Sequence, residues 1–272
     1  MLSIYCTGHR WSTMVCKAFA RGTKAPIVPH APLLPGDAFF YGCLRGLMPT
    51  IQQAMREKRT YYYGDNGYMR PGKNELGHFR ITKNALQHTG TGDFPIPEAL
   101  AYKRFKGLGL EIKKWRKNGK HVLVCPPMRL SGAVWGYDSD KWLADTLETL
   151  KKHTDRELRV RAKMSWNDNK GPNTASYEGR PKTELRTMAE DLDGAWALVS
   201  YNSNAATEAL LAGVPVFNAE ACGSYAMGTP DLSKIETPRM DGDRHRWAAM
   251  LACNQWTLEE MRNGTAWKML NP

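Results

Sequence analysis

Three small polar residues lie between a short apolar run, 195–199, and good helix-forming sequence at 205–211. They are Asn202, Ser203 and Asn204. Each suits the N-cap of a helix, and the backbone N–H groups at a helix N-terminus attract an anion because the helix dipole favours negative charge there. Glu208 follows one turn later, where its carboxylate can reach a sugar hydroxyl. The spacing therefore predicts a strand, a turn that binds a phosphate group, and a helix.

Two cations, Arg161 and Lys163, end a second strand-like segment at 158–163. Cations in this position can neutralise a bound anion, and they can equally be an ordinary basic strand terminus. We favour the functional interpretation, because the segment belongs to the same half of the chain as the predicted phosphate site.

Two side chains in the N-terminal half are candidates for general-base chemistry. Asp65 follows the predicted strand 60–63, and the glycines that flank it predict a tight turn that presents the carboxylate at the strand's end. His9 lies in the loop after the predicted strand 2–6, where binding sites of open α/β sheets lie. The alternatives are a turn residue that bonds to its own backbone for Asp65 and a structural histidine for His9.

The elements that must position these residues alternate between strands and helices, which indicates an α/β fold. The predicted strands are 2–6, 37–41, 60–63, 121–125, 158–163, 195–199 and a strand that begins at 214. The predicted helices are one that ends near residue 21, then 48–58, 138–153, 182–190, 205–211, 244–253 and 258–264. Residues 64–97 show little apolar periodicity and are expected to be irregular. Trp247 and Trp256 are expected to anchor the core.

The composition indicates two modest domains and a polyanionic partner. The chain has 272 residues, 38 Lys and Arg against 27 Asp and Glu, and a net charge of +11. Nucleic acid is the first candidate partner, and the alternative is a basic protein without one. The six cysteines are scattered, which favours neither a disulfide framework nor a metal site. We expect no membrane association, a cytoplasmic location and a monomer.

Residues 103–120 contain eight Lys or Arg residues and one Glu, with Phe105 and Trp115 among them. This composition suits a surface that contacts phosphates and stacks on bases, and it equally suits a solvated linker between domains. We place the domain boundary here, with an N-terminal domain at 1–115 and a C-terminal domain at 116–272.

Four segments of the C-terminal part resemble the donor-binding half of a two-domain, GT-B-type glycosyltransferase. They look closest to the capsule-polysaccharide Kdo-transferase-like group and its phage-encoded relatives. The segments are 202–216, 125–127, 159–163 and 246–264, and the N-terminal segments 63–68 and 79–84 also resemble the phage group. Nucleotide-sugar epimerases show strings similar to the first segment.

The resemblance implies two Rossmann-like domains that face each other across a cleft, with the donor on the C-terminal domain and the last helix packed back on the N-terminal one. Because the chain is short for this fold, the N-terminal domain is expected to be reduced. Asn202, Ser203 and Asn204 would hold the donor phosphate and Glu208 the donor ribose. Arg161 and Lys163 would neutralise the leaving phosphate without a metal ion. A UDP-sugar is the expected donor.

The net charge and the phage resemblance together favour double-stranded DNA as the acceptor. We expect sugar transfer to the hydroxymethyl group of a modified pyrimidine, with 5-hydroxymethylcytosine first, after the base has been flipped out of the duplex. Asp65 is the first candidate base and His9 the second. The residues assigned to the acceptor are Arg10, Arg70, Arg80, Asn84, Lys113, Lys114 and Arg116. The alternatives are a polysaccharide glycosyltransferase, a non-catalytic DNA-binding protein of this fold and a nucleotide-sugar epimerase.

Overall fold

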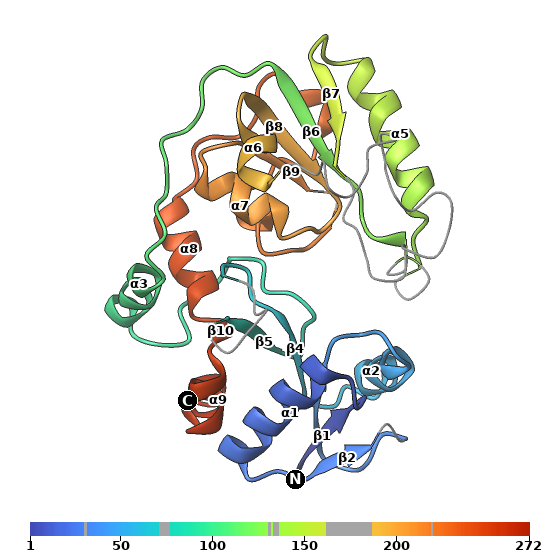
Figure 1. The fold of residues 1–272 in the computed structure, drawn as a ribbon, viewed down its shortest axis with the longest axis vertical. Helices are drawn as coiled ribbons and strands as arrows, with labels where there is room; N and C mark the ends of the chain where they lie inside the picture. The colour runs from blue at the N-terminus through green and yellow to red at the C-terminus, as the bar shows by residue number, and fades with distance from the viewer. Residues whose placement is uncertain (30–31, 71–76, 130–131, 133–135, 162–186, 219) are drawn as a thin grey trace. The chain divides into compact units, whose positions relative to one another are not determined.

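The computed structural model divides the chain into two compact units (Figure 1). The first contains Met1–Gly109 and Ala248–Pro272, and the second contains Leu110–Trp247. The structure describes residues 1–29, 32–70, 77–129, 132, 136–161, 187–218 and 220–272. The domain boundary at 115 and the facing of the domains across a cleft stay predictions.

A mixed sheet of six described strands forms the centre of the first unit. In sheet order the strands are β10 (Gln255–Trp256), β5 (Phe79–Lys83), β4 (Tyr61–Asn66), β3 (Asp37–Tyr41), β1 (Leu2–Cys6) and β2 (Ile27–Pro29). The strands β4, β3, β1 and β2 are parallel, whereas β5 and β10 run antiparallel to their neighbours. The central residues of β1, β3 and β4 are mostly apolar and buried, which is typical of a parallel sheet covered on both faces.

Two crossover helices of the first unit belong to opposite faces of this sheet. Helix α1 (Arg10–Thr23) joins β1 to β2 toward one edge, and α2 (Leu47–Arg56) joins β3 to β4 toward the other. Crossovers between parallel strands are right-handed. Two crossovers that move toward opposite edges of the sheet therefore place their helices on opposite faces. Phe19 of α1 stacks on Phe39 of β3 with ring centroids 4.4 Å apart, so the apolar stripe of α1 joins the main core.

The C-terminal segment completes the first unit. Helices α9 (Leu258–Arg262) and α10 (Thr265–Leu270) pack against α1, and Trp256 is buried in the same core. Beside β5, the buried side chain of Gln255 accepts a hydrogen bond from Met69 N at 3.0 Å and donates one to Met69 O at 2.9 Å. Residues far apart in the sequence thus share one sheet and one core.

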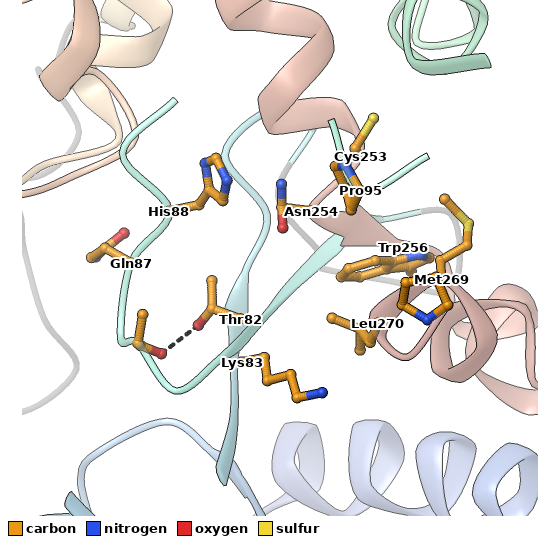
Figure 2. Close-up of a pocket in the computed structure, with 12 residues that line it drawn as sticks. Thr82, Lys83, Gln87, His88, Pro95, Cys253, Asn254, Trp256, Met269 and Leu270 are labelled. Atoms are coloured by element: carbon orange, nitrogen blue, oxygen red, sulfur yellow. Dashed lines mark hydrogen bonds between the residues drawn. The ribbon is translucent and has the colours of Figure 1, made fainter. Parts of the chain in front are cut away.

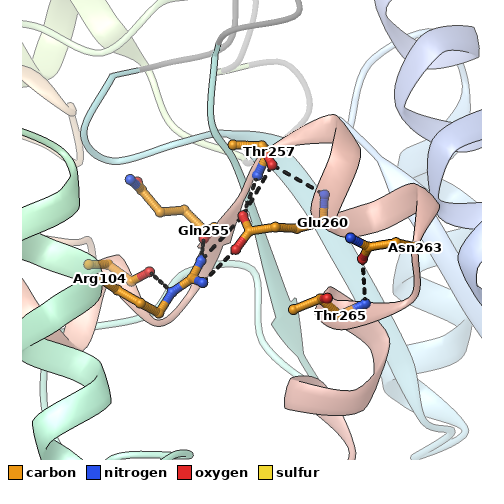
Figure 3. Close-up of polar contacts among 7 residues, drawn as sticks. Arg104, Gln255, Thr257, Glu260, Asn263 and Thr265 are labelled. Atoms are coloured by element: carbon orange, nitrogen blue, oxygen red, sulfur yellow. Dashed lines mark hydrogen bonds and ion pairs between the residues drawn. The ribbon is translucent and has the colours of Figure 1, made fainter.

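Arg104 fastens α3 (Glu98–Gly107) to this returning segment (Figure 3). Its guanidinium donates to the backbone oxygens of Ala252 and Gln255 at 3.2 and 2.8 Å, and it forms an ion pair with Glu260 at 2.5 Å. Glu260 also accepts a hydrogen bond from Thr257 N at 2.8 Å, which completes a capping box at the start of α9. One carboxylate therefore serves both the helix start and the ion pair.

A four-stranded parallel sheet forms the centre of the second unit, with the order β7 (Glu157–Val160), β6 (His121–Cys125), β8 (Ala195–Ser200) and β9 (Val216–Asn218). Every residue of β6 and β8 is buried, as their continuous apolar sequences predict. Helix α5 (Ser139–Lys151) covers one face through its apolar stripe, and the side chain of Asp138 caps its N-terminus.

Helix α7 (Ala205–Leu211) follows β8 and ends as the sequence predicts. Gly213 has φ +79°, Val214 N bonds to Ala209 O at 2.9 Å, and Gly213 N bonds to Leu210 O at 3.2 Å. These bonds form a Schellman motif, in which glycine takes the left-handed conformation at low cost. The remaining elements are α6 (Met188–Leu192), two short 3-10 helices at Tyr225–Met227 and Leu232–Lys234, and α8 (Arg244–Ala252).

The α/β class is confirmed, and so are Trp247 and Trp256 as buried core residues. Two expectations are wrong. Strand β4 extends through Asp65 because β5 pairs with it, so Asp65 is not in a tight turn. Residues 64–97 are not wholly irregular, because β5 lies among them. Among the residues that the structure describes, no helix is long and apolar enough to cross a membrane.

Candidate functional site

The carboxyl ends of β6 and β8 form a topological switch point in the second unit. The chain runs from β6 outward to β7 and then returns to the other side of β6 to form β8. Ligands of open α/β sheets bind in the crevice at such a point. Cys125 and Ser200, the last residues of β6 and β8, pair in register, so the loops that follow them start side by side.

Arg161 and Glu208 both lie close to this switch point. Arg161 N donates to Val124 O at 2.8 Å, and the Arg161 guanidinium forms an ion pair with Asp191 of α6. Burial raises the pKa of the Cys125 thiol to about 12, while the charge of Arg161 lowers it and those of Asp191 and Glu208 raise it. Arg161 directly follows β7, and Glu208 lies on α7, which follows β8, so both belong to segments that begin at the carboxyl edge of this parallel sheet.

The predicted phosphate turn is closed by its own hydrogen bonds. Ser203 Oγ accepts from Ala205 N at 3.2 Å, and Ser203 O accepts from Ala206 N at 3.1 Å. Asn204 O accepts from the next two amides of α7 at 3.0 and 3.3 Å. In this conformation an anion must displace the Ser203 hydroxyl to reach the amide of Ala205. Binding of a donor phosphate by this turn stays a prediction.

Two buried hydroxyls beside the turn were not predicted. Ser200 Oγ and Thr207 Oγ1 are both buried, and neither has a hydrogen-bond partner among the described groups. Leaving a buried hydroxyl unpaired costs about 1–3 kcal/mol, so such groups usually meet a water molecule or a ligand. Ser200 ends β8 and Thr207 lies in the first turn of α7, so both flank the predicted turn.

An aromatic cluster also lies at this edge. Tyr201 follows β8 directly, and its ring centroid is 4.7 Å from that of Tyr137 and 6.0 Å from that of Trp142. All three side chains are half-buried, so part of the cluster faces solvent. Of the other predicted donor residues, Asn202 is half-buried in the same loop as Tyr201, and Lys163 lies outside the described residues.

In the first unit, Asp65 of β4 lies opposite Arg80 of β5. Arg80 Nη2 donates to Asp65 Oδ2 at 2.9 Å, and Arg80 Nη1 donates to Asn66 O at 3.2 Å. Tyr63 Oη also donates to Asp65 Oδ2, at 3.3 Å. The Arg80 side chain is only 5% exposed, whereas that of Asp65 is 34% exposed. Arg80, predicted to touch the acceptor, therefore lies beneath Asp65 and holds it.

His9 and Arg10 lie at the exposed start of α1, where His9 is the N-cap residue. The preceding glycine, Gly8, has φ +74°, a conformation that suits glycine in this tight loop. The loop follows β1, and Asp65 lies near the end of the parallel strand β4, so both candidate bases belong to the carboxyl edge of one sheet. Arg10 also lies over the ring of Trp11 at 5.5 Å.

The predicted acceptor residues do not form one surface in the first unit. Arg70 is exposed, and its Nε donates to Leu108 O at 2.7 Å. Asn84 lies past the far end of β5, about 13 Å from Arg80 at the usual rise of a strand, and its Oδ1 accepts from Tyr61 N at 2.9 Å. Arg80 and Asn84 therefore do not act as a pair.

The basic stretch is partly structural. Lys113 and Lys114 are exposed, but Arg116 Nη1 donates to the backbone oxygens of Leu192 and Ala195 at 2.6 and 3.1 Å. Phe105 is buried in the first unit and cannot stack on a base, and the guanidinium of Arg244 lies 3.8 Å from the ring centroid of Trp115. Of the three residues of this stretch that were assigned to the acceptor, Lys113 and Lys114 are therefore better placed than Arg116 to contact phosphates.

A small pocket of about 200 Å³ lies elsewhere in the first unit, between the end of β5, β10 and the C-terminal residues (Figure 2). Trp256, Met269 and Leu270 line one side and His88 another. None of the predicted site residues lines this pocket, and it lies at the end of β5 opposite to Arg80. The pocket is therefore separate from the Asp65 edge.

Within the described part of the chain, no group of three His, Cys, Asp or Glu side chains is placed to hold a metal ion.

No family model matches the sequence, and no curated protein shows significant similarity to it. Solved structures of two Kdo transferases have a fold similar to that of this chain. One is Thermosulfurimonas dismutans KpsC, beta Kdo 2,4 transferase, with 13% identity and a TM-score of 0.51 over 91% of this chain and 89% of that chain. Another is the KpsC beta Kdo 2,7 transferase of the same organism, with 11% identity and a TM-score of 0.50 over 99% and 98%.

Proposed function

We propose that the protein is a glycosyltransferase that moves a sugar from a nucleotide-activated donor to an acceptor hydroxyl. The observation that carries this proposal is the fold, which is similar to that of a solved Kdo transferase over about nine tenths of both chains. The cluster of charged and polar groups at the switch point of the second unit agrees with it, because that is where a donor binds in such folds.

In the second unit, Arg161 stabilises the charge that develops on the leaving phosphate. Asp191 orients the guanidinium through the ion pair, and Glu208 binds a hydroxyl of the donor. Preorganised cations at a leaving group contribute through electrostatic stabilisation of the transition state. Tyr201 and Tyr137 supply an aromatic surface for the donor base. Ser203, Asn204 and Asn202 take the diphosphate after the turn has opened, and Lys163 assists Arg161.

In the first unit, Asp65 accepts the proton of the acceptor hydroxyl as that hydroxyl attacks the sugar. Arg80 and Tyr63 hold its Oδ2 atom, and part of the carboxylate stays exposed. His9 is the second candidate, because it is exposed on the loop that follows β1, at the same carboxyl edge of the sheet. The two units would meet across a cleft, with the donor on one side and the acceptor on the other.

We propose hydroxymethylated pyrimidine in double-stranded DNA, with 5-hydroxymethylcytosine first, as the acceptor and a UDP-sugar as the donor. The net charge of +11 supports a polyanionic acceptor, because phosphate contacts supply most of the affinity for DNA. Lys113, Lys114, Arg10 and Arg70 are the exposed cations assigned to the duplex.

A glycan acceptor is the second candidate, because the two solved structures of this fold are named as Kdo transferases. A transferase of this kind has no need of a strongly basic surface, so its binding would depend little on salt. The two candidate functions therefore differ in how strongly acceptor binding depends on salt, and this dependence is measured without knowledge of the sugar.

The test incubates the protein with a hydroxymethylcytosine duplex and a panel of UDP-sugars and CMP-Kdo, followed by digestion to nucleosides and mass spectrometry. A gain of one sugar mass on the modified nucleoside supports the proposal, and an unmodified cytosine duplex is the control. Donor turnover only with a glycan acceptor would move the assignment to the second candidate. No turnover with any acceptor, together with salt-dependent DNA binding, would instead indicate a non-catalytic binding protein, and donor conversion without an acceptor would indicate an epimerase.

A further inference from the structure

One cysteine lies at the carboxyl end of β1 in surroundings that the proposed transfer reaction does not use. Cys6 is the last residue of β1, and it is partly exposed. Of the other five cysteines, Cys43 is also partly exposed, while the rest are buried. Because reactivity needs both access and a stabilised thiolate, Cys6 and Cys43 are the two to compare.

Hydroxyl groups from the first turn of α1 surround the Cys6 sulfur. Cys6 Sγ lies 3.8 Å from Ser12 Oγ and 3.7 Å from Thr13 Oγ1. Thr7 N donates to Ser12 Oγ at 3.4 Å, which fixes the position of that hydroxyl. The N-terminal turn of a helix also favours negative charge, so the geometry stabilises a thiolate at this position.

A second thiol reaches the same hydroxyl from inside the core. Cys16 Sγ lies 3.8 Å from Ser12 Oγ, and it donates to Tyr5 O at 3.6 Å. Tyr5 O belongs to the peptide group that precedes Cys6. The hydroxyl of Ser12 thus contacts both sulfurs, and the buried Cys16 thiol lies beside the end of β1.

The two thiols affect each other's protonation. The neighbouring Cys16 side chain lowers the pKa of Cys6 against the opposing effect of burial, and Gly8 N, Thr13 and Ser12 lower it further, to about 5. The proximity of Cys6 and burial raise the pKa of Cys16. Near neutral pH the pair therefore carries one negative charge, which resides on the more exposed sulfur.

We propose that Cys6 and Cys16 form an oxidation site for peroxides, with Cys6 as the attacking thiolate and Cys16 as the resolving thiol. The Cys6 sulfur attacks one peroxide oxygen, the O–O bond breaks, and the leaving hydroxide takes up a proton as water. Cys6 is then a sulfenic acid, oxidised by two electrons. The Cys16 sulfur displaces the sulfenic hydroxyl, which leaves as water with the Cys16 proton, and a disulfide forms. A dithiol reductant such as dithiothreitol restores both thiols.

The first test maps alkylation of the reduced protein by iodoacetamide as a function of pH, with peptide mass spectrometry. We expect Cys6 to react with a midpoint near pH 5 and, at mildly acidic pH, at least about tenfold faster than Cys43. In the Cys16→Ala variant, which has no donor at this position, the midpoint for Cys6 should move up toward that of an ordinary thiol, near 8.5. Equal rates for Cys6 and Cys43 in the wild-type protein would overturn the proposal.

The second test adds hydrogen peroxide and needs no assumption about sugar transfer. The wild-type protein should give a Cys6–Cys16 disulfide that dithiothreitol removes. Cys16→Ser should instead give a sulfenic acid on Cys6 that dimedone traps, and Cys43→Ser should behave as the wild-type protein does. Circular dichroism checks that each variant is folded. Dimedone labelling of wild-type Cys6 to the same extent as in Cys16→Ser, without a disulfide, would show that Cys16 does not resolve it.

Discussion

Asp65 and Arg80 are joined across adjacent antiparallel strands by an ion pair of 2.9 Å, with the cation almost fully buried and the carboxylate one-third exposed. Arg80 also lies over the ring of Tyr68 at 5.1 Å. The exposed member of the pair is thus the member proposed for chemistry, and the buried member supports it from below. Because only Asp65 is exposed, we expect substitutions of Asp65 and of Arg80 to affect activity and stability differently.

Replacing Asp65 by Asn should destabilise the first unit, because it leaves the Arg80 guanidinium buried without its counter-charge. Loss of one partner of a buried pair costs about 3–5 kcal/mol, and the partial exposure of Asp65 places the expected loss near the lower end. Urea unfolding followed by circular dichroism measures it. The exposed Asp93→Asn is the matched control and should change the free energy of unfolding by less than about 0.5 kcal/mol.

Rates of sugar transfer by single-residue variants distinguish the proposed base, Asp65, from Arg80, which holds it. If Asp65 is the base, Asp65→Asn should abolish sugar transfer at temperatures where the variant is still folded, while His9→Gln should retain it. The reverse order of activities would assign the base to His9. Arg80→Lys should keep more activity than Arg80→Met, because lysine restores the charge but not the two-pronged geometry.

Replacing Arg161 by Met should reduce transfer about 100-fold, because it removes a cation that faces the leaving group. Asp191→Asn should give a smaller loss, since the guanidinium stays but its orientation is no longer held. Arg159→Met is the matched control on the same segment, where Arg159 pairs with Glu157 of β7. Initial rates at saturating donor provide the comparison, and equal losses in the two arginine variants would contradict the assignment of Arg161.

Replacing Glu260 by Gln should lower stability by about 1.5–3 kcal/mol, because the variant loses a charge-assisted bond to Arg104. Burial opposes ionisation of Glu260, but the Arg104 guanidinium and the Thr257 groups outweigh it and lower the pKa of the carboxyl. Its contribution should therefore be complete above the unfolded pKa, near 4.5, and lost as the pH falls through the lower folded value. Thermal unfolding measured from pH 7 to pH 3 tests this. The neighbouring Glu259→Gln, on the exposed side of α9, should leave the curve unchanged.

His88 should make the protein sensitive to mild acid. Burial lowers the pKa of His88 to about 4, and its Nδ1 accepts a hydrogen bond from Gly90 N at 3.0 Å that only the unprotonated ring atom can accept. The unfolded chain binds a proton at higher pH than the folded chain does. Stability should thus be complete above about pH 6.5 and fall by up to about 3 kcal/mol as the pH drops to 4.

Urea midpoints measured between pH 7 and pH 4 test this dependence on His88. The slope should flatten in His88→Gln and persist in His245→Gln, because His245 is exposed. An unchanged slope in His88→Gln would assign the acid sensitivity to other groups, of which His78 is one, since burial lowers its pKa as well.

Elements with a strong local pattern were predictable. The continuous apolar runs of β6 and β8, the stripe of α5 and the glycine that ends α7 each follow from neighbouring residues alone. Contacts over long sequence separations were not. Strand β10 is only two residues long and exists because β5 offers it an edge. The same pairing of β5 with β4 turned the predicted turn at Asp65 into a strand, which is tertiary context overriding glycine propensity.

The candidate sites were likewise predictable from local sequence only in part. Residue types predicted which end of each strand carries polar groups, because loops at the carboxyl edges hold them. The partners of those groups were beyond prediction: Asp191 for Arg161, and Arg80 as the support of Asp65. Arg116 was predicted to be a surface cation from the charge run, yet it satisfies the carbonyl oxygens of Leu192 and Ala195. A run of lysines and arginines does not reveal which of its members the fold uses.

The return of Ala248–Pro272 to the first sheet sets an order for folding during synthesis. When Gly109 leaves the ribosome, β5 still has an unpaired edge, and α1 lacks the helices that pack against it. Translation of the second unit takes on the order of ten seconds at about 5–20 residues per second. Throughout that interval the nascent first unit exposes an edge strand and an apolar helix face, which are the features that chaperones bind. The second unit, contiguous in sequence, is able to finish folding before the first.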